Sequence, residues 1–434
     1  MNVETMVASG WLHYFFLKAD GSLYAMGSNS YGQLGTGNNT DVDNLTQITN
    51  GVAAVYTGQY TSFILKRDGS LHGTGRNEYG QLGLGDNNDR STFAPIPVQG
   101  VKGVSTCDGH TLILKNDGSV WAIGINHGTL GVGDNNDRDV FTATNLTSDV
   151  IAVATCVTHS LALKKDGTVW GTGEGPALGL TTFPNTFVQI FSGAKAIATG
   201  AEKGYSLILA NDGTVYATGL NYFGQLGIGN TEEFVFEFTK VIDNTGAFLT
   251  DVTAIAAGND HSLALKTDGT LWATGWNISG QLGAGDKTDR NQFTQVTTGV
   301  KTMSAGELHT VVVKNGETIE TFGKVNPFYA LNGNSSIVIK VNDNRYGQYI
   351  TRSILSDSDG LQLYYYSQNI TNANPLTISV KPGTFNLEFR VSNSTAVRRF
   401  NDVVVADNET VTFTYEYVSA GLGSYEWTVT RTPK

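Results

Sequence analysis

Residues 262–275 have the sequence SLALKTDGTLWATG, in which two short apolar runs flank the pair Asp268-Gly269. An Asp-Gly pair between alternating apolar runs predicts a β-hairpin with both turn residues at positive φ. Further copies of the pair are Asp20-Gly21, Asp68-Gly69, Asp117-Gly118, Asp166-Gly167 and Asp212-Gly213, with a degenerate seventh copy at Asn315-Gly316. Successive copies are 48, 49, 49, 46, 56 and 47 residues apart. The chain therefore consists largely of a repeat of about 50 residues.

Each repeat predicts three or four short strands and almost no helix. After each hairpin come a closing glycine and, in most copies, Gly-Gln-Leu-Gly or a variant, as at residues 32–35 and 280–283. The 52 glycines and 8 prolines fit turns, and no window shows a sustained 3.6-residue period. Four-stranded units repeated radially make a β-propeller, so seven copies predict seven blades. Because inner-strand residues begin at Glu4 and the last copy ends near Leu331, we expect both ends to share one blade and close the ring.

The repeat resembles that of the regulator-of-chromosome-condensation family. The similarity rests on Gly-x-x-His-Ser/Thr, the Asp-Gly-Thr-Val/Leu-Trp/Tyr hairpin and Gly-Gln-Leu-Gly-x-Gly, with the fullest copy at residues 257–286. It covers about residues 1–331 and implies a seven-bladed propeller that acts as a protein-binding platform. The family includes nucleotide-exchange factors for small GTPases, ubiquitin-ligase modules, a secreted enzyme inhibitor, and surface or phage proteins. Fold alone does not choose among these roles.

A second domain is predicted over residues 332–434. Eight alternating segments between residues 337 and 430, with turn signals such as Lys381-Pro382-Gly383, predict a small antiparallel β-sandwich. Residues 382–405 resemble transthyretin-like or immunoglobulin-like accessory sandwiches, which attach or space a larger domain. The predicted fold is therefore all-β, a seven-bladed β-propeller followed by a β-sandwich.

The charge of the chain restricts its partners. The formal net charge is −11, and the propeller carries the acidic excess. An acidic surface repels phosphate backbones, so we expect no nucleic-acid partner. Residues 1–17 lack the basic start of a signal peptide, and no apolar run is long enough to span a membrane. We expect a soluble protein made in the cytoplasm without membrane insertion; a place in a virion or outside the cell after release is left open.

Histidine and cysteine follow the repeat. Five histidines occupy one repeat position, which spreads them around the axis: His13, His110, His159, His261 and His309. We interpret each imidazole as bonding to backbone within its own blade, which disfavours a metal site or catalytic base. Cys107 and Cys156 replace a repeat glycine and are predicted to be buried free thiols, with a disulfide as the alternative. No Cys-x-x-Cys pattern indicates zinc.

The Asn/Asp-rich loops, such as Asp86 to Arg90 and Asp134 to Arg138, offer clustered oxygen ligands. They lack the frame of a calcium loop, and turn-forming Asx chemistry explains them, so Ca²⁺ is only an alternative. No phosphate-binding loop or nucleophile elbow is present. The prediction is therefore a non-enzymatic protein with no cofactor, no metal and no catalytic residue, with a hydrolase or lyase as a weaker alternative.

Residues that break the repeat are the candidate binding residues. They are Glu174 and Pro176 of the fourth blade, and Lys203, Glu232, Glu233, Phe234, Phe236 and Phe238 of the fifth. Aromatics flanked by acids can form an interface patch. Alternatively, the three phenylalanines alternate along the last strand of the blade with one face buried.

Two functions follow. The leading hypothesis is a binding or structural protein whose propeller recognises a protein or cell surface, as in a phage tail or virion appendage that contacts the host. The alternative is an intracellular regulator, a GTPase exchange factor or enzyme inhibitor, that acts through a propeller face. The sequence leaves the partner, the binding face and the oligomeric state open.

Overall fold

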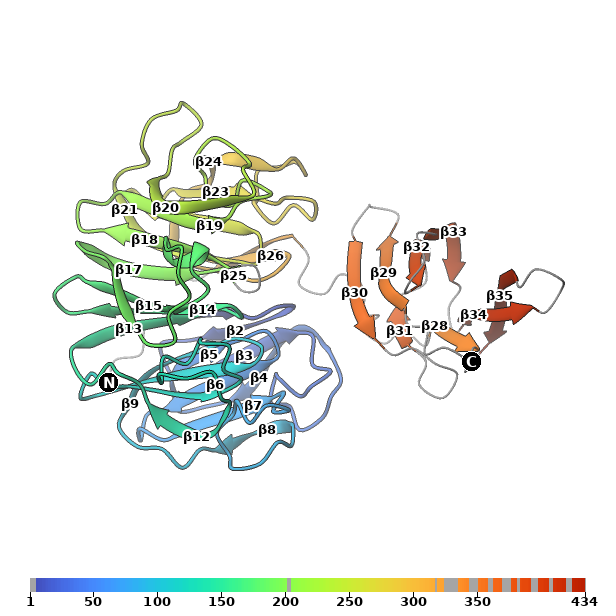
Figure 1. The fold of residues 1–434 in the computed structure, drawn as a ribbon, viewed down its shortest axis with the longest axis horizontal. Coiled ribbons are helices and arrows are strands. Elements are labelled where there is room, and N and C mark those ends of the chain that lie inside the picture. Colours follow the sequence, from blue (N-terminus) through green and yellow to red (C-terminus); the bar gives the residue numbers. More distant parts are fainter. Residues whose placement is uncertain are drawn as a thin grey trace. The chain divides into compact units, whose positions relative to one another are not determined.

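The chain divides into two compact units, Met1–Val325 and Asn326–Lys434 (Figure 1). The computed structural model describes residues 5–200, 204–316 and 318–323 in full, together with the backbone of eight strands between residues 335 and 433. The predicted domain boundary at residues 331 and 332 lies outside the described residues.

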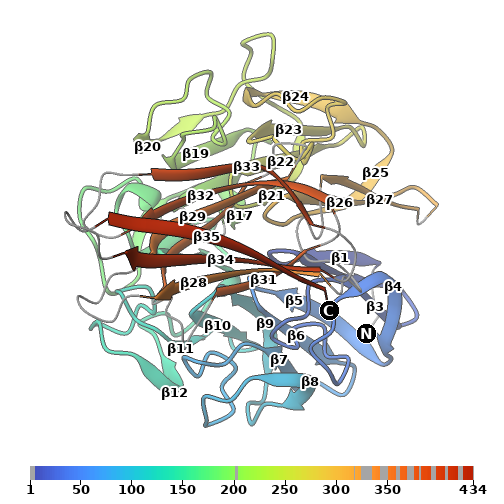
Figure 2. The same cartoon turned by 90° about the vertical axis from the view of Figure 1, so that its right-hand side faces the viewer.

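The first unit is a seven-bladed propeller, whose sheets form a ring in Figure 2. Blade 1 comprises β1 (Met6–Ser9), β2 (His13–Leu17), β3 (Leu23–Gly27) and β4 (Val42–Thr49). Blade 2 comprises β5 (Val52–Thr57), β6 (Thr61–Lys66), β7 (Leu71–Gly75) and β8 (Arg90–Pro95). Blade 3 comprises β9 (Val101–Thr106), β10 (His110–Lys115), β11 (Val120–Gly124) and β12 (Arg138–Ala143).

Blade 4 comprises β13 (Val150–Thr155), β14 (His159–Lys164), β15 (Val169–Gly173) and β16 (Val188–Phe191), with the short 3₁₀ helix η1 (Pro176–Leu178) before β16. Blade 5 comprises β17 (Ala194–Thr199), β18 (Tyr205–Ala210), β19 (Val215–Leu220) and β20 (Phe234–Lys240). Blade 6 comprises β21 (Val252–Ala257), β22 (His261–Lys266), β23 (Leu271–Gly275) and β24 (Arg290–Thr297). Blade 7 comprises β25 (Val300–Ala305), β26 (His309–Lys314) and β27 (Ile319–Gly323).

The Asp-Gly pairs form hairpins, but with a different turn from the one expected. In blade 6 the Gly269 N–H donates to the Lys266 carbonyl (3.0 Å), and the Lys266 N–H donates to the Thr270 carbonyl (3.0 Å). Gly269 has φ +78°, whereas Asp268 is not among the described non-glycine residues at positive φ. This is the three-residue hairpin with a glycine bulge. The Asp268 carboxylate accepts the Thr270 N–H (2.9 Å) and hydroxyl (2.6 Å), which explains the aspartate.

The antiparallel order of the strands gives the propeller two distinct faces. Successive strands of a blade pair in sequence, so the connections alternate between the two ends of the blade. We call one end the loop face, formed by the loops between first and second strands and between third and fourth strands. The other end, the hairpin face, holds the Asp-Gly hairpins and the connections between blades. The Gly-Gln-Leu-Gly segments therefore lie on the loop face.

The apolar core lies between adjacent blades. The second strand of each blade is almost wholly buried, and the clusters that surround it combine side chains of neighbouring blades, as Leu207 of blade 5 and Phe293 of blade 6 do. The second glycine of Gly-Gln-Leu-Gly supports a phenylalanine from the next blade. At Gly227 (φ +69°) an added Cβ would lie 2.5 Å from the Phe293 ring. Only glycine allows both this φ and this contact.

The expectation that both chain ends share a blade is wrong for the described residues. The first sheet holds β1 to β4, and the last holds β25 to β27. The ring closes by packing: Val7 and Phe16 share a cluster with Val311 and Val313. The Ser9 N–H also donates to the Ser304 hydroxyl (2.8 Å). In blade 7, Phe322 of the third strand packs against Gly283. In other blades a phenylalanine of the fourth strand packs against the equivalent glycine.

The second unit is entirely β in its described part. Its strands are β28 (Ser335–Asn342), β29 (Ile350–Asp357), β30 (Gln362–Gln368), β31 (Leu376–Val380), β32 (Gly383–Val391), β33 (Val397–Val405), β34 (Glu409–Val418) and β35 (Ser424–Pro433). They form two four-stranded sheets, ordered β31-β28-β34-β35 and β30-β29-β32-β33. All pairs are antiparallel except the parallel pair β28 and β34. Packing of the two sheets as a sandwich stays a prediction.

Candidate functional site: the loop face of the propeller

Four of the five repeated histidines connect one blade to the next, which corrects the predicted bonds within each blade. His159 Nε2 lies 2.8 Å from the Ser206 hydroxyl of blade 5, and His110 Nε2 lies 2.9 Å from the Ser160 hydroxyl of blade 4. Equivalent contacts join His13 to Ser62 and His261 to Thr310. Sequence patterns could not show this partnership, because it depends on the lateral packing of blades.

Both cysteines are free and buried, in agreement with the sequence prediction. The Ser206 hydroxyl donates to the Ala177 carbonyl (2.6 Å), so it must accept the proton of His159 Nε2. His159 Nδ1 is then an acceptor, and the Cys156 thiol, 2.9 Å away, donates to it. Cys107 lies 3.1 Å from His110 Nδ1 in the same manner. Burial lowers the pKa of His159 to about 3 and raises the pKa of Cys107 to about 12. Both Cys–His pairs are therefore uncharged hydrogen-bonded pairs with a structural role.

We expect both thiols to be unreactive in the native protein. Cys156 is fully buried and Cys107 is 3 % exposed, and the thiolate is the reactive form. Ellman's reagent should therefore label neither cysteine in buffer and both in guanidinium chloride. Rapid labelling of either thiol in buffer would contradict this account of the Cys–His chains.

The Asn/Asp loops are closed by their own side chains. In blade 2 Asp86 pairs with Arg90 (2.7 Å), and Asp89 accepts the Asn77 N–H (2.8 Å). Blades 3 and 6 repeat the ion pair with Asp134–Arg138 and Asp286–Arg290. In the described part of the chain, no group of three or more His, Cys, Asp or Glu side chains is placed to hold a metal ion. Asx turns and ion pairs account for these loops.

The two faces differ in charge. The acidic side chains of the loop face are Asp41, Glu78, Asp86, Asp89, Asp108, Asp134, Asp137, Glu174, Glu232, Glu233, Asp260, Asp286, Asp289 and Glu307. Its basic side chains in the described residues are Arg76, Arg90, Arg138, Lys287 and Arg290. Most described lysines lie toward the hairpin face, where they alternate with the hairpin aspartates, as Lys18, Lys66, Lys115, Lys164, Lys266 and Lys314 do. The loop face is therefore the acidic face of the propeller.

Three of these lysines cover tryptophans in a pattern that recurs between blades. The Nζ atoms of Lys115, Lys164 and Lys266 lie 4.0, 4.5 and 4.5 Å from the ring centroids of Trp121, Trp170 and Trp272. Since the contact recurs at one repeat position, it serves the blade itself.

Aromatic residues surround Arg76 on the loop face, and no other described blade has an arginine at this repeat position; blade 6 has Trp276 there, packed on Phe223. The Arg76 guanidinium carbon lies 5.5, 5.8 and 5.3 Å from the ring centroids of Tyr31, Tyr60 and Tyr79. Trp11 packs edge-on against Tyr60 (4.8 Å between centroids). Asp108 of blade 3 accepts a 2.8 Å bond from Arg76, and Glu78 also pairs with it. We call Trp11, Tyr31, Tyr60, Arg76 and Tyr79 the Arg76 cluster.

The Arg76 cluster has the composition of a protein-binding hot spot, because Trp, Tyr and Arg dominate such sites. Its members come from blades 1 and 2 and are all partly exposed. This cluster was not predicted from the sequence. A signal was available, since Arg76 occupies a repeat position that holds Ser28 in blade 1 and Ile125 in blade 3.

The fourth-blade candidates have structural roles. Pro176 is the first residue of η1, and its carbonyl accepts the Thr218 hydroxyl of blade 5 (3.2 Å). Glu174 is partly buried beside Gly204, where an added Cβ would lie 2.9 Å from its carboxylate. Lys203 lies outside the described residues.

The fifth-blade candidates separate into two groups. Phe238 matches the phenylalanine that other blades place on the Gly-Gln-Leu-Gly glycine, and it packs 3.1 Å from the Cβ position of Gly179 and against Phe191. Phe234 and Phe236 are 37 % and 50 % exposed, with ring centroids 6.2 Å apart. Glu232 and Glu233 are exposed, and Glu233 accepts the hydroxyl of Tyr222. Phe238 thus packs against its blade, whereas Phe234 and Phe236 are exposed and can contact a partner.

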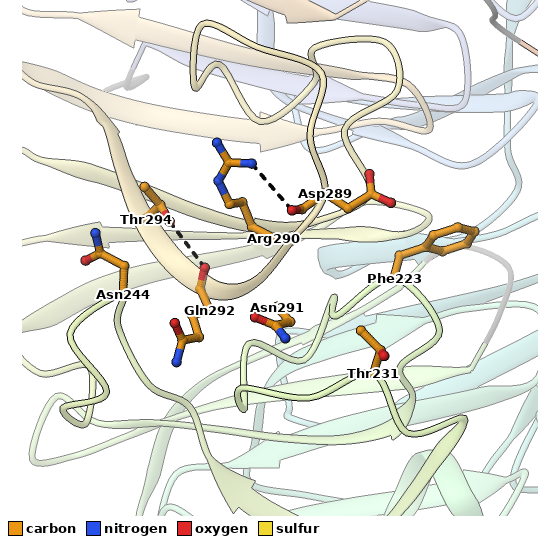
Figure 3. Close-up of a pocket in the computed structure, with 8 residues that line it drawn as sticks. All are labelled: Phe223, Thr231, Asn244, Asp289, Arg290, Asn291, Gln292 and Thr294. Carbon is orange, nitrogen blue, oxygen red and sulfur yellow. Dashed lines mark hydrogen bonds between the residues drawn. The ribbon is translucent and has the colours of Figure 1, made fainter.

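A pocket of about 430 Å³ lies between blades 5 and 6 (Figure 3). Its lining residues are Phe223, Thr231, Asn244, Asp289, Arg290, Asn291, Gln292 and Thr294. The volume falls within the range of small-ligand sites. Asn244 belongs to an insertion that lengthens the spacing from Asp212 to Asp268 to 56 residues. The long spacing was visible in the sequence, but only the fold shows that the inserted residues form one side of a pocket.

The described part of the chain contains no helix long and apolar enough to cross a membrane.

Comparisons with known proteins agree with the repeat. Residues 7–33, 52–81 and 252–281 match one profile of the Regulator of chromosome condensation (RCC1) repeat, and residues 68–114, 212–265 and 268–313 match another. The chain is 36 % identical over 133 residues to the ultraviolet-B receptor UVR8 of Arabidopsis thaliana, which covers 30 % of this chain and 29 % of that protein. It is 38 % identical over 93 residues to the RCC2 homolog of Danio rerio, covering 21 % and 18 %. The aligned segments therefore span less than a third of these relatives.

Solved structures show the same fold. Human WBSCR16 has a TM-score of 0.62 at 24 % identity and covers 73 % of this chain and 88 % of its own. Prp20p of Saccharomyces cerevisiae, whose structure was reported with its binding to Gsp1p and histones, has a TM-score of 0.61 at 18 % identity, with 73 % and 82 % covered. The chain therefore carries regulator of chromosome condensation repeats folded into a seven-bladed β-propeller.

Proposed function

We propose that this protein is a non-enzymatic regulator that binds a partner protein through the loop face of its propeller. The observation that carries the proposal is the concentration of non-recurring aromatic and charged side chains on that face. Side chains that recur in every blade stabilise the blade, whereas Arg76 and the exposed pair Phe234 and Phe236, at the loop-face end of β20, do not recur. Such partly exposed aromatic and arginine side chains supply most of the binding energy in protein interfaces.

The comparisons favour the regulator over the surface-recognition protein. Prp20p was characterised with Gsp1p and histones, and another structure shows yeast RCC1 bound to Kap60, so proteins that contain this fold bind other proteins. The phage-tail hypothesis has no support from these comparisons. The Cys–His pairs are buried and neutral, so the chemistry that they resemble is not available to a substrate.

The test is affinity capture from extract of the source organism with three forms of the full chain. We expect Arg76→Ala to weaken partner binding about 30-fold, the equivalent of about 2 kcal/mol for a hot-spot residue. Lys165→Ala, on the hairpin face, is the matched charge-removal control and should leave binding unchanged. Thermal melts of each variant establish that the propeller is intact.

Loss of binding in Lys165→Ala with full binding in Arg76→Ala would place the interface on the hairpin face and contradict the proposal. A captured small GTPase can then be assayed for accelerated nucleotide release, and a captured enzyme for inhibition. Either activity identifies the kind of regulation.

A further inference from the structure

The pocket between blades 5 and 6 depends on the insertion that follows β20. Val241 and Leu249 are buried at its two ends (1 % and 0 % exposed). The Ile242 N–H donates to the Gly227 carbonyl of blade 5 (2.8 Å), and the Asn244 N–H donates to the Phe293 carbonyl of blade 6 (3.0 Å). The insertion is therefore fixed to both blades, and Asn244 has a defined position at the edge of the pocket (Figure 3).

The pocket lining differs from the equivalent surface of other blades. Alignment of Arg290 and Phe293 with Arg138 and Phe141 places Gln292 where blade 3 has Val140. Among the described residues, the side-chain amides of Asn244 and Gln292 make no hydrogen bond. Since the repeat does not require these groups for folding, they are available to a ligand.

The pocket joins an aromatic and acidic surface. Phe223 and Thr231 of the lining belong to the same loop as Tyr222, Glu232 and Glu233, and this loop leads directly into Phe234 and Phe236. Tyr222 is 50 % exposed. We call Tyr222, Glu232, Glu233, Phe234 and Phe236 the blade-5 ledge.

The blade-5 ledge is specific to its blade. Phe234 stands where blades 2 and 6 have Asp89 and Asp289, whose carboxylates close the loop by accepting backbone N–H groups. In blade 5 the Glu233 carbonyl accepts the equivalent Asn221 N–H (3.0 Å). The residue at position 234 therefore has no part in closing the loop, and the Phe234 side chain is exposed.

The charge of the pocket is negative once the internal pairs are considered. Arg290 donates to Asp286 (2.6 Å) and to the Thr288 carbonyl (2.6 Å), so its charge is compensated. Figure 3 shows its guanidinium directed toward the main chain of Asp289 and away from Asn291 and Thr231. Asp289 lines the pocket, and its carboxylate, which accepts the Asn277 N–H (2.7 Å), has capacity for further donors.

We propose that this pocket receives an arginine side chain from an extended, basic segment of the partner protein. The guanidinium offers five donors and no acceptor, which suits the amide oxygens of Asn244 and Gln292, the Thr231 hydroxyl and the Asp289 carboxylate. Aromatic rings such as Phe223 stack against guanidinium planes. The flanking residues of the segment lie on the blade-5 ledge. This inference rests on the proposed function and names the chemistry of its partner.

The probe is a fluorescein-labelled peptide of alternating arginine and serine, measured by fluorescence anisotropy with the full chain. One matched peptide replaces arginine by lysine, which keeps the charge. A second replaces arginine by citrulline, which keeps the shape and removes the charge. We expect the arginine peptide to bind about tenfold more tightly than the lysine peptide, because one additional hydrogen bond from a charged donor has about this effect. The citrulline peptide should not bind.

Two variants test the location. Gln292→Val installs the side chain of blade 3, and Asn244→Ala shortens the insertion side chain; each should weaken the arginine peptide about tenfold. Val140→Ala, at the matching position of blade 3, should bind normally. Equal affinity of all variants, equal affinity of the arginine and lysine peptides, or no binding of the arginine peptide would each overturn the proposal. Partner capture that Arg76→Ala removes and Gln292→Val preserves would also overturn it, while leaving the proposed function standing.

Discussion

Acidification from pH 7 to pH 5 is expected to unfold the propeller, because five histidines are buried in the uncharged form. The pKa of each is lowered to about 3, mainly by burial and, except at His309, also by a nearby histidine. The five are His13, His110, His159, His261 and His309. In the unfolded chain a histidine titrates near pH 6.5. The unfolded state therefore binds protons first as the pH falls.

The sign follows from linkage. The stability contributed by neutral imidazoles is fully present above about pH 6.5 and is lost as the pH falls toward 3. At pH 5 each histidine favours the unfolded state by about 2 kcal/mol, and five together by about 10 kcal/mol. This is comparable to the whole stability of a typical domain, about 5–15 kcal/mol.

Urea unfolding followed by circular dichroism at steps from pH 7 to pH 4 measures this effect. His110→Thr provides a variant that the repeat already accepts, because Thr61 fills the same position in blade 2. It should reduce the proton uptake on unfolding by one and move the acid midpoint downward. Phe248→Ala, which removes an exposed side chain that binds no proton, should leave the proton uptake unchanged. Constant stability between pH 7 and pH 5 would contradict the buried neutral state.

Replacement of Phe293 by alanine is expected to destabilise the propeller by about 3–5 kcal/mol. The ring is fully buried, lies against Gly227 and belongs to the core cluster shared by blades 5 and 6. Its loss leaves a cavity that neither blade can fill, because Gly227 has no side chain and the surrounding strands are hydrogen-bonded.

Phe248→Ala is the matched control for this substitution. Phe248 lies in the neighbouring insertion and is 58 % exposed, so its truncation should change stability by less than about 0.5 kcal/mol. Denaturant unfolding at pH 7 measures both variants. Similar losses in the two would mean that the space between blades is not a packed core.

The propeller could be predicted from short-range signals alone. The Asp-Gly hairpins and the glycine-closed strands specify local geometry, and their regular recurrence specifies a ring. The same recurrence explained the histidines and cysteines as parts of the fold. The sequence grouped Phe238 with Phe234 and Phe236 and left open whether they form a patch or alternate along a strand, because the pattern does not show a bulge. The register shift between β19 and β20 separates these side chains, so that one packs inward and two are exposed.

Contacts between blades required the tertiary structure. His159 meets Ser206, Arg76 meets Tyr31, and Asn244 meets the edge of blade 6 only because blades lie side by side around an axis. The sequence by itself determined the blade, because hairpins and turns depend on neighbours a few residues apart. Tertiary structure decided what lies between blades, including the ring closure and the pocket, since those contacts join residues about one repeat or more apart.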